Sequence, residues 1–145
     1  MGQQQLILII LVTVLVGIAT VVAIDTYTET ATSANLDAIR IDLGTIGAQA
    51  QAFYNKPIEL GGGGRKFTNI SFMEITIARD SLNDNNMMFK NQNALYSIES
   101  VAENEIVVTA QPTSGEAMNF SNVWNTDLTL LAEISVGNID IRFQN

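Results

Sequence analysis

The feature that most constrains this chain is the apolar segment near its beginning. From Leu6 to Ile24 the sequence carries no charged residue and no proline. A helix needs about 20 apolar residues to cross a hydrocarbon layer about 30 Å thick, and this segment is close to that length. No Lys or Arg precedes it, and no small-residue cleavage pattern follows Ile24, which favours a retained span over a cleaved secretory signal. We therefore expect the chain to reside in a membrane at some stage.

A second, amphipathic segment continues the helical pattern. No proline occurs from Asp25 to Tyr54, and the apolar residues recur at alternating steps of three and four. This stripe consists of Leu36, Ile39, Leu43, Ile46, Ala50 and Phe53. A single helix from Gln3 to Tyr54 would be roughly 78 Å long at a rise of about 1.5 Å per residue. A chain of this size cannot bury such a helix, so lipid or other copies of the chain must cover its apolar half.

The helix is predicted to end before Pro57, because proline disfavours the α conformation of the residue before it and lacks a backbone N–H. Four glycines, Gly61 to Gly64, follow closely. The sequence thus predicts three parts: a long helix over 1–56 (apolar 6–24, amphipathic 25–54), a Gly-rich hinge over 57–66 and a β-rich head over 67–145.

Beyond the hinge, apolar residues recur at every second position, which is typical of half-buried strands. The segments with this pattern are 68–78, 94–101, 105–110, 128–136 and 139–143. Short strands separated by Asn, Asp, Ser and Gly predict an antiparallel sandwich or barrel. The expected fold class is therefore α+β, with a long N-terminal helix and a C-terminal antiparallel β-sandwich or barrel head.

Composition excludes the common kinds of catalytic site. The chain of 145 residues has no Cys and no His, so thiolate nucleophiles, imidazole bases and zinc sites of the usual kind cannot form. Lys and Arg number 7 against 15 Asp and Glu, which argues against nucleic acid as a primary ligand. The oxygen-rich segment 80–86 lacks the EF-hand register, and Gly61 to Gly64 lack the Walker spacing. We expect no enzyme activity, no cofactor and no metal.

Some smaller features allow two interpretations. Gly17, Gly44 and Gly47 could permit close approach between helices, or the latter two could let the helix bend around the head. Asn69 and Asn119 each begin an N-glycosylation sequon, and the loop-like surroundings of Asn119 make it the favoured acceptor.

An apolar half-helix, an amphipathic continuation and a small β-rich head together resemble the type IV pilin-like superfamily. In its unbroken helix and its lack of Cys, the chain is more similar to archaeal-type pilins and archaellins than to bacterial major pilins. That family carries an acidic residue near the start of the mature helix; here Gln5 stands at that place, or Ile7 if a peptidase trims after Gly2. The resemblance therefore implies a divergent N-terminus.

The resemblance also implies a function. It predicts a structural subunit of an extracellular type IV pilus-like filament (a fimbrium), inserted in the cytoplasmic membrane before assembly machinery polymerises it, with surface-exposed heads for adhesion. The partners would be identical copies of the chain, the membrane and the pilus assembly machinery. The predicted filament-core residues are Leu6, Ile10, Val14, Gly17, Val21 and Ile24. The predicted helix-to-head contacts are Leu36, Ile39, Leu43, Ile46 and Phe53.

The alternative is a monomeric, N-terminally membrane-anchored extracytoplasmic binding domain, or a minor pseudopilin. It needs a span only to about Ile24 and also packs the amphipathic stripe on its own head. The stripe therefore does not distinguish the two.

Overall fold

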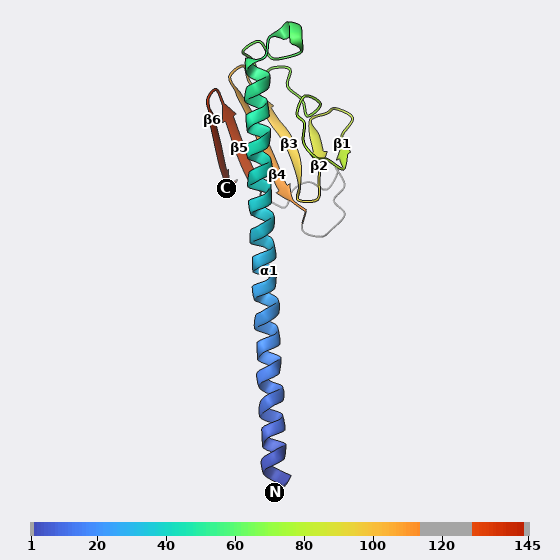
Figure 1. Cartoon of the computed structure of the whole chain (residues 1–145), viewed down its shortest axis with the longest axis vertical. Coiled ribbons are helices and arrows are strands. Elements are labelled where there is room, and N and C mark those ends of the chain that lie inside the picture. Colours follow the sequence, from blue (N-terminus) through green and yellow to red (C-terminus); the bar gives the residue numbers. More distant parts are fainter. Residues whose placement is uncertain (1, 114–128, 144–145) are drawn as a thin grey trace. The chain divides into compact units, whose positions relative to one another are not determined.

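The structure is a computed structural model that describes residues 2–113 and 129–143 (Figure 1). Residues 1–34 and 35–145 form two separate compact units. The described elements are α1 (Gly2–Asn55), the 3₁₀ turn η1 (Ile58–Leu60), β1 (Ser81–Leu82), β2 (Met88–Lys90), β3 (Ala94–Val101), β4 (Glu105–Pro112), β5 (Leu130–Ser135) and β6 (Asn138–Phe143). The expected α+β class with a long N-terminal helix is confirmed.

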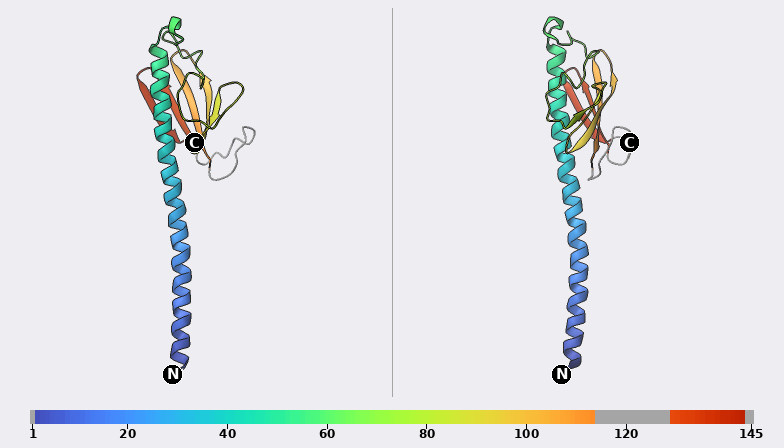
Figure 2. Two further views of the ribbon diagram at one scale, coloured as in Figure 1. Left: turned by 45° about the vertical axis from the view of Figure 1, so that its right-hand side comes forward. Right: turned by 90° about the vertical axis from the view of Figure 1, so that its right-hand side faces the viewer.

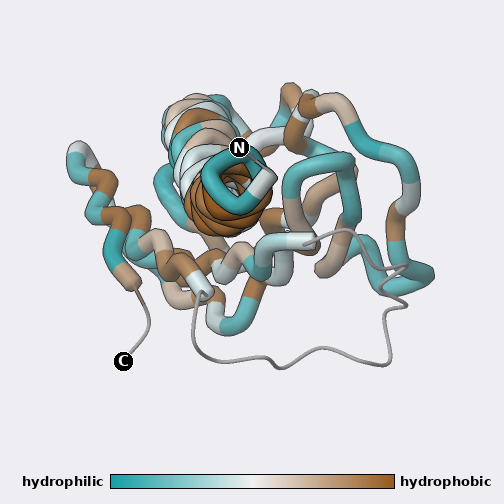
Figure 3. The backbone as a smooth tube through the Cα atoms, turned by 90° about the horizontal axis from the view of Figure 1, so that it is seen from below, coloured by the Kyte–Doolittle hydropathy of each residue, from teal (hydrophilic) through white to brown (hydrophobic). Residues whose placement is uncertain are grey.

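Within the first unit, residues 2–34 belong to α1 and their side chains are exposed. The apolar colouring in Figure 3 marks the turns that follow the N-terminus. The last turns of α1 within this unit are rich in threonine, which has a low helix propensity because its branched side chain is restricted. Here Thr26, Thr28 and Thr30 each donate a hydroxyl hydrogen to the carbonyl four residues earlier, at 2.9, 2.7 and 2.8 Å. These bonds keep the hydroxyls from competing for other backbone groups, and the segment is helical throughout.

In the second unit, residues 35–55 of α1 run along one face of the sheet (Figure 2). Ile39, Leu43 and Ile46 have no solvent-exposed surface, and Phe53 is only 8% exposed. Leu36 packs against the edge of the same core. The predicted helix-to-head residues thus all lie in or against the hydrophobic core.

Within the residues that the structure describes, the sheet has six antiparallel strands in the order β1-β2-β3-β4-β5-β6. Alternate residues of the central strands turn toward the helix. These core residues include Tyr96, Ile98, Ile106, Val108, Ala110, Ala132 and Ile134. In register, Val108 stands opposite Ile98 on β3 and Ala132 on β5, so the apolar rows line up across the strands.

The prediction of a sandwich or barrel is wrong in this detail. All strands in the described part of the chain belong to one sheet, and β1 does not pair with β6 within it. The physical reason is the amphipathic half of α1. Its apolar stripe covers the sheet face that a second sheet would otherwise have to bury.

The predicted strand over 68–78 is also wrong. This segment is an irregular chain of turns, in which the N–H of Ile70 bonds to the carbonyl of Phe67 at 2.9 Å and that of Glu74 to Ser71 at 3.1 Å. Ile70, Phe72 and Ile75 are buried in the core. Alternating apolar residues therefore anchor a coil here, while the short strands β1 and β2 were not predicted.

The glycines of the predicted hinge close the C-terminal end of α1. The N–H groups of Gly63, Gly64 and Arg65 donate to carbonyls in the last turn of the helix and just after it, at 2.8, 3.0 and 2.8 Å. A Cβ on Gly62 would collide with the carbonyl of Lys56, and one on Gly63 with that of Lys66. Because the backbone returns so close to itself here, a side chain would not fit at these two positions, which explains the glycines.

Candidate functional site

The first candidate surface is the apolar part of α1. Every large apolar side chain from Leu6 to Ile24 is between 48% and 65% exposed. The predicted filament-core residues Leu6, Ile10, Val14, Gly17, Val21 and Ile24 all lie on this exposed surface. They form one stripe, whereas the structure exposes apolar side chains on all sides of the helix. The whole circumference therefore requires an apolar environment.

The threonine hydroxyls within this surface form hydrogen bonds with backbone carbonyls of the same helix. The hydroxyl of Thr13 donates to the carbonyl of Ile10, and that of Thr20 to Val16, both at 2.8 Å. By length and composition α1 can cross a membrane, although a signal sequence near an N-terminus has the same properties. The surface fits either lipid or an apolar protein interior.

The structure separates the glycines of α1 into two kinds. A Cβ on Gly47 would lie 2.6 Å from Cδ1 of Ile139 on β6, so contact with the chain's own sheet explains this glycine. A Cβ on Gly44 or Gly17 would meet no atom within 4 Å. Near Gly44, the side chain of Ile41 is 71% exposed. Packing within the described chain therefore does not account for Gly17 and Gly44.

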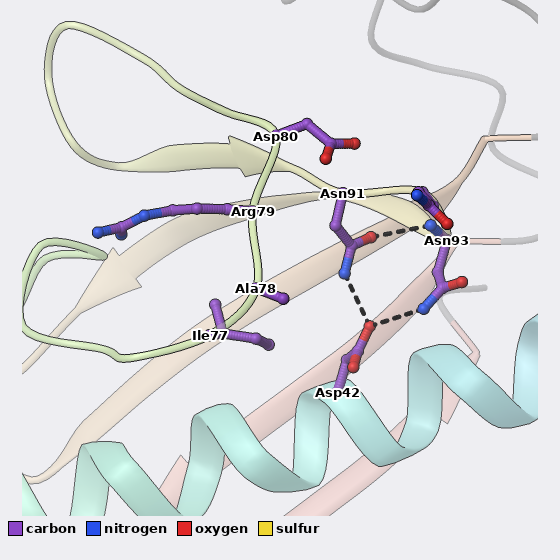
Figure 4. A pocket seen from close by; sticks show the side chains of 8 residues that line it. Asp42, Ile77, Ala78, Arg79, Asp80, Asn91 and Asn93 are labelled. Atoms are coloured by element: carbon purple, nitrogen blue, oxygen red, sulfur yellow. Dashed lines mark hydrogen bonds between the residues drawn. The ribbon is translucent and has the colours of Figure 1, made fainter.

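The second candidate is a polar site in the other unit, centred on Asp42 of α1 (Figure 4). One carboxylate oxygen, Oδ2, accepts three hydrogen bonds. The donors are the hydroxyl of Tyr96 at 2.7 Å, Nδ2 of Asn91 at 2.9 Å and Nδ2 of Asn93 at 3.1 Å. The site therefore joins the helix to β3 and to the loop between β2 and β3.

Local hydrogen bonds fix the loop that supplies the two asparagines. Oδ1 of Asn91 accepts the N–H groups of Asn93 and Ala94, each at 2.9 Å, in the manner of an Asx turn. The carbonyl of Asn93 accepts the N–H of Thr113 at 3.1 Å and Nδ2 of Asn35 at 3.3 Å. Asn91 is only 8% exposed, so its side chain has one fixed orientation toward Asp42.

Tyr96 is the buried end of this network. Burial raises its pKa well above the ordinary value, and the hydrogen bond to Asp42 and the charge of Asp42 raise it further, against a smaller lowering by Asn91. Its ring stacks on Phe89 with centroids 4.6 Å apart. The hydroxyl therefore stays protonated and remains a donor to Asp42.

A pocket of about 440 Å³ opens beside Asp42. Its lining residues are Asp42, Ile77, Ala78, Arg79, Asp80, Asn91, Gln92 and Asn93. Arg79 donates to the carbonyl of Phe72, and Figure 4 shows its guanidinium directed away from Asp42. Within residues 2–113 and 129–143, Asp42 takes part in no ion pair.

Sequence reasoning missed this site. A signal was present, because Asp42 lies between Ile39 and Ile46 at helical spacing and thus borders the apolar stripe. A charged residue there needs hydrogen-bond partners from the layer that the stripe covers. The partners themselves could not be assigned without the strand register.

The structure describes one of the two predicted glycosylation sequons. Asn69 is exposed and lies in a turn, whereas Asn119, the favoured acceptor, lies outside the described residues.

Comparisons of the chain with protein-family models, with curated proteins and with solved structures give no match. The interpretation of both surfaces therefore depends on their own geometry and chemistry.

Proposed function

We propose that this chain is a structural subunit of an extracellular type IV pilus-like filament that polymerises through its apolar N-terminal helix. The observation that carries the proposal is the uncharged apolar surface from Leu6 to Ile24, whose large side chains are all exposed. Burying one large aliphatic side chain contributes about 1.5–3 kcal/mol. A surface with so many of them cannot remain in water, so it needs partners along its whole length.

Lipid and identical helices can cover this surface in turn. As a monomer the helix would lie in the cytoplasmic membrane, where lipid covers all of its sides. In the filament, copies of the same helix would replace the lipid, and head-to-tail contacts that do not close into a ring would extend the polymer. The transfer keeps the apolar surface buried in both states, with the pilus assembly machinery moving subunits between them.

The two unexplained glycines support packing between helices. A glycine inside a helix costs about 0.8–1.0 kcal/mol relative to alanine. Gly17 and Gly44 carry this cost without a contact in the described chain that requires it. Small residues allow the backbones of neighbouring helices to approach closely, which a tightly packed filament core would need.

The β head would lie on the outside of the filament and serve adhesion. We do not propose an enzyme, and no nucleic acid, cofactor or metal enters the proposal. Asn69, exposed in a turn before the sheet, would be accessible to a glycosylation machinery acting on the exported head.

The pocket beside Asp42 favours a second candidate function. A monomeric, membrane-anchored extracytoplasmic binding domain needs one span and one binding site, and the chain has a surface suited to each. A minor pseudopilin would combine the same two surfaces.

Electron microscopy of material sheared from cells that make the chain tests the proposal. We expect thin fibres with this protein as their main component. Gly17→Leu keeps the helix apolar, so we expect this variant to enter the membrane but to form few or no fibres. Ala31→Leu is the matched control, because it adds the same side chain at another small, exposed helix residue outside the apolar run and away from the possible trimming site at Gly2. A wild-type protein that stays in membranes without fibres would favour the anchored binding domain.

A further inference from the structure

We propose that the pocket beside Asp42 binds a primary alkylamine, with the ammonium group at the Asp42 carboxylate and the alkyl chain against Ile77 and Ala78. This inference does not depend on the filament, because the pocket lies entirely within residues 35–145. It names a ligand class for the pocket that the second candidate function uses and that the filament does not need.

The first step is the charge of Asp42. Its three hydrogen-bond donors, Tyr96, Asn91 and Asn93, are neutral groups, so they hold the carboxylate in place without neutralising it. The carboxylate is half-buried at the edge of the pocket. A charge in that position interacts more strongly with a bound cation than one in open water, because the surroundings screen it less.

The second step is the position of the basic residue in the described lining of the pocket. Arg79 is the basic residue among the lining side chains, but its guanidinium donates to the carbonyl of Phe72 and points away from Asp42 in Figure 4. Asp80 adds a second carboxylate to the lining. Its backbone is fixed at the start of β1 by the bond from its N–H to the carbonyl of Lys90 at 2.8 Å. The described lining therefore has two carboxylates against one guanidinium that is held away from Asp42, which favours a cation over an anion beside Asp42.

The third step is the match between the lining and a primary amine. An ammonium group has three N–H donors and no acceptor. Asp42 and Asp80 supply carboxylate acceptors in the lining, and an ammonium at Oδ1 of Asp42 would displace none of the three donors at Oδ2. Ile77 and Ala78 form an apolar part of the wall, which suits methylene groups. Free diamines and lysine side chains share this chemistry.

Titration of the ¹⁵N-labelled full chain in detergent micelles tests the site. The probe is n-butylamine, followed by the side-chain amide signals of Asn91 and Asn93. Butan-1-ol has the same alkyl chain without the charge, and tetramethylammonium has the charge without N–H donors. We expect saturable shifts with butylamine, and binding at least tenfold weaker with either control, as loss of a charge-assisted hydrogen bond implies. Equal binding of butanol or tetramethylammonium, or no saturation by butylamine, would overturn the proposal.

Two variants keep the test independent of folding, since Asp42→Asn also alters the network around Tyr96. Asp80→Asn removes the second carboxylate, and Ala78→Phe adds a large side chain to the pocket lining, while neither residue takes part in the hydrogen bonds of Asp42. We expect each to weaken butylamine binding about tenfold or more with the Asn91 and Asn93 signals retained. Undiminished binding by both variants would refute the site.

Two further probes identify the source of the amine. Nα-acetyl-lysine methylamide represents a lysine side chain, and 1,4-diaminobutane represents a free diamine. Tighter binding of either one supports the proposal and names the source. Tighter binding of Ca²⁺ than of any amine would contradict it.

Discussion

Two glycines of one helix, Gly44 and Gly47, should respond in opposite ways to the same substitution. For Gly44→Ala, the new Cβ meets no atom within 4 Å, so only helix propensity changes. Alanine is favoured over glycine in a helix interior by about 0.8–1.0 kcal/mol, and the free energy of unfolding should rise by about that amount. For a domain of this size, this corresponds to an increase in Tm of about 4 °C.

For Gly47→Ala, the same propensity gain meets a steric cost. The Cβ would lie 2.6, 3.0 and 3.1 Å from Cδ1, Cγ1 and Cγ2 of Ile139. Overpacking of this kind costs about 1–3 kcal/mol. Since Ile139 is only half-buried and its end can move, we expect a net loss between about zero and 2 kcal/mol. The two variants should therefore differ by about 1–3 kcal/mol.

The assay is urea unfolding of the full chain in detergent micelles, followed by circular dichroism, with hydrogen exchange of β3 and β4 as a local readout. Equal effects of the two substitutions would refute the assignment of Gly47 to the helix–sheet contact. Filament assembly adds a second test. If Gly44 permits close approach of another helix, Gly44→Ala should stabilise the monomer and yet reduce fibre yield. Unchanged fibre yield would refute that role.

Three further predictions concern the second unit. Tyr96→Phe keeps the ring but removes the donor to Asp42, so unfolding free energy at pH 7 should fall by about 1.5–3 kcal/mol in urea titrations. Because the pKa of Tyr96 is raised above its ordinary value of 10.0, the stabilisation that Tyr96 contributes is complete below about pH 10 and declines at higher pH, and Tyr96→Phe should flatten this decline above about pH 10. Gly63→Ala should lower stability by more than about 1 kcal/mol and speed hydrogen exchange of the amides of Gly63 and Arg65, because its Cβ would collide with the carbonyl of Lys66. Asn69→Gln should remove one glycan mass from protein isolated from its native source, and an unchanged intact mass would exclude modification there.

The local pattern of the sequence predicted the helix well because helical period depends on neighbouring residues. The spacing of Leu36, Ile39 and Leu43 fixes one face of α1 whatever the rest of the chain does. The same pattern could not distinguish a sheet covered by a helix from a sheet covered by another sheet. That choice depends on which element reaches the apolar face, and it was decided by the stripe of α1 itself.

The failures have a common physical origin in contacts between distant residues. Ile70, Phe72 and Ile75 have the spacing of a strand, but their backbone bonds within local turns. The partners of Asp42 are about 50 residues away along the chain, with separations of 49, 51 and 54. No pattern within a short window contains that information, so the polar site could be found only from the structure.

The packing of Ile39, Leu43 and Phe53 in the core decides where the chain can be cut. A fragment that begins after the glycines would keep all six strands but would expose the face that α1 covers, and we expect it to aggregate or remain unfolded. A fragment that begins near Asn35 would keep the core and the Asp42 network and lose the apolar run together with the threonine-rich turns that follow it. The compact unit that contains the sheet thus begins in the middle of a helix, and roughly the last six turns of that helix belong to it.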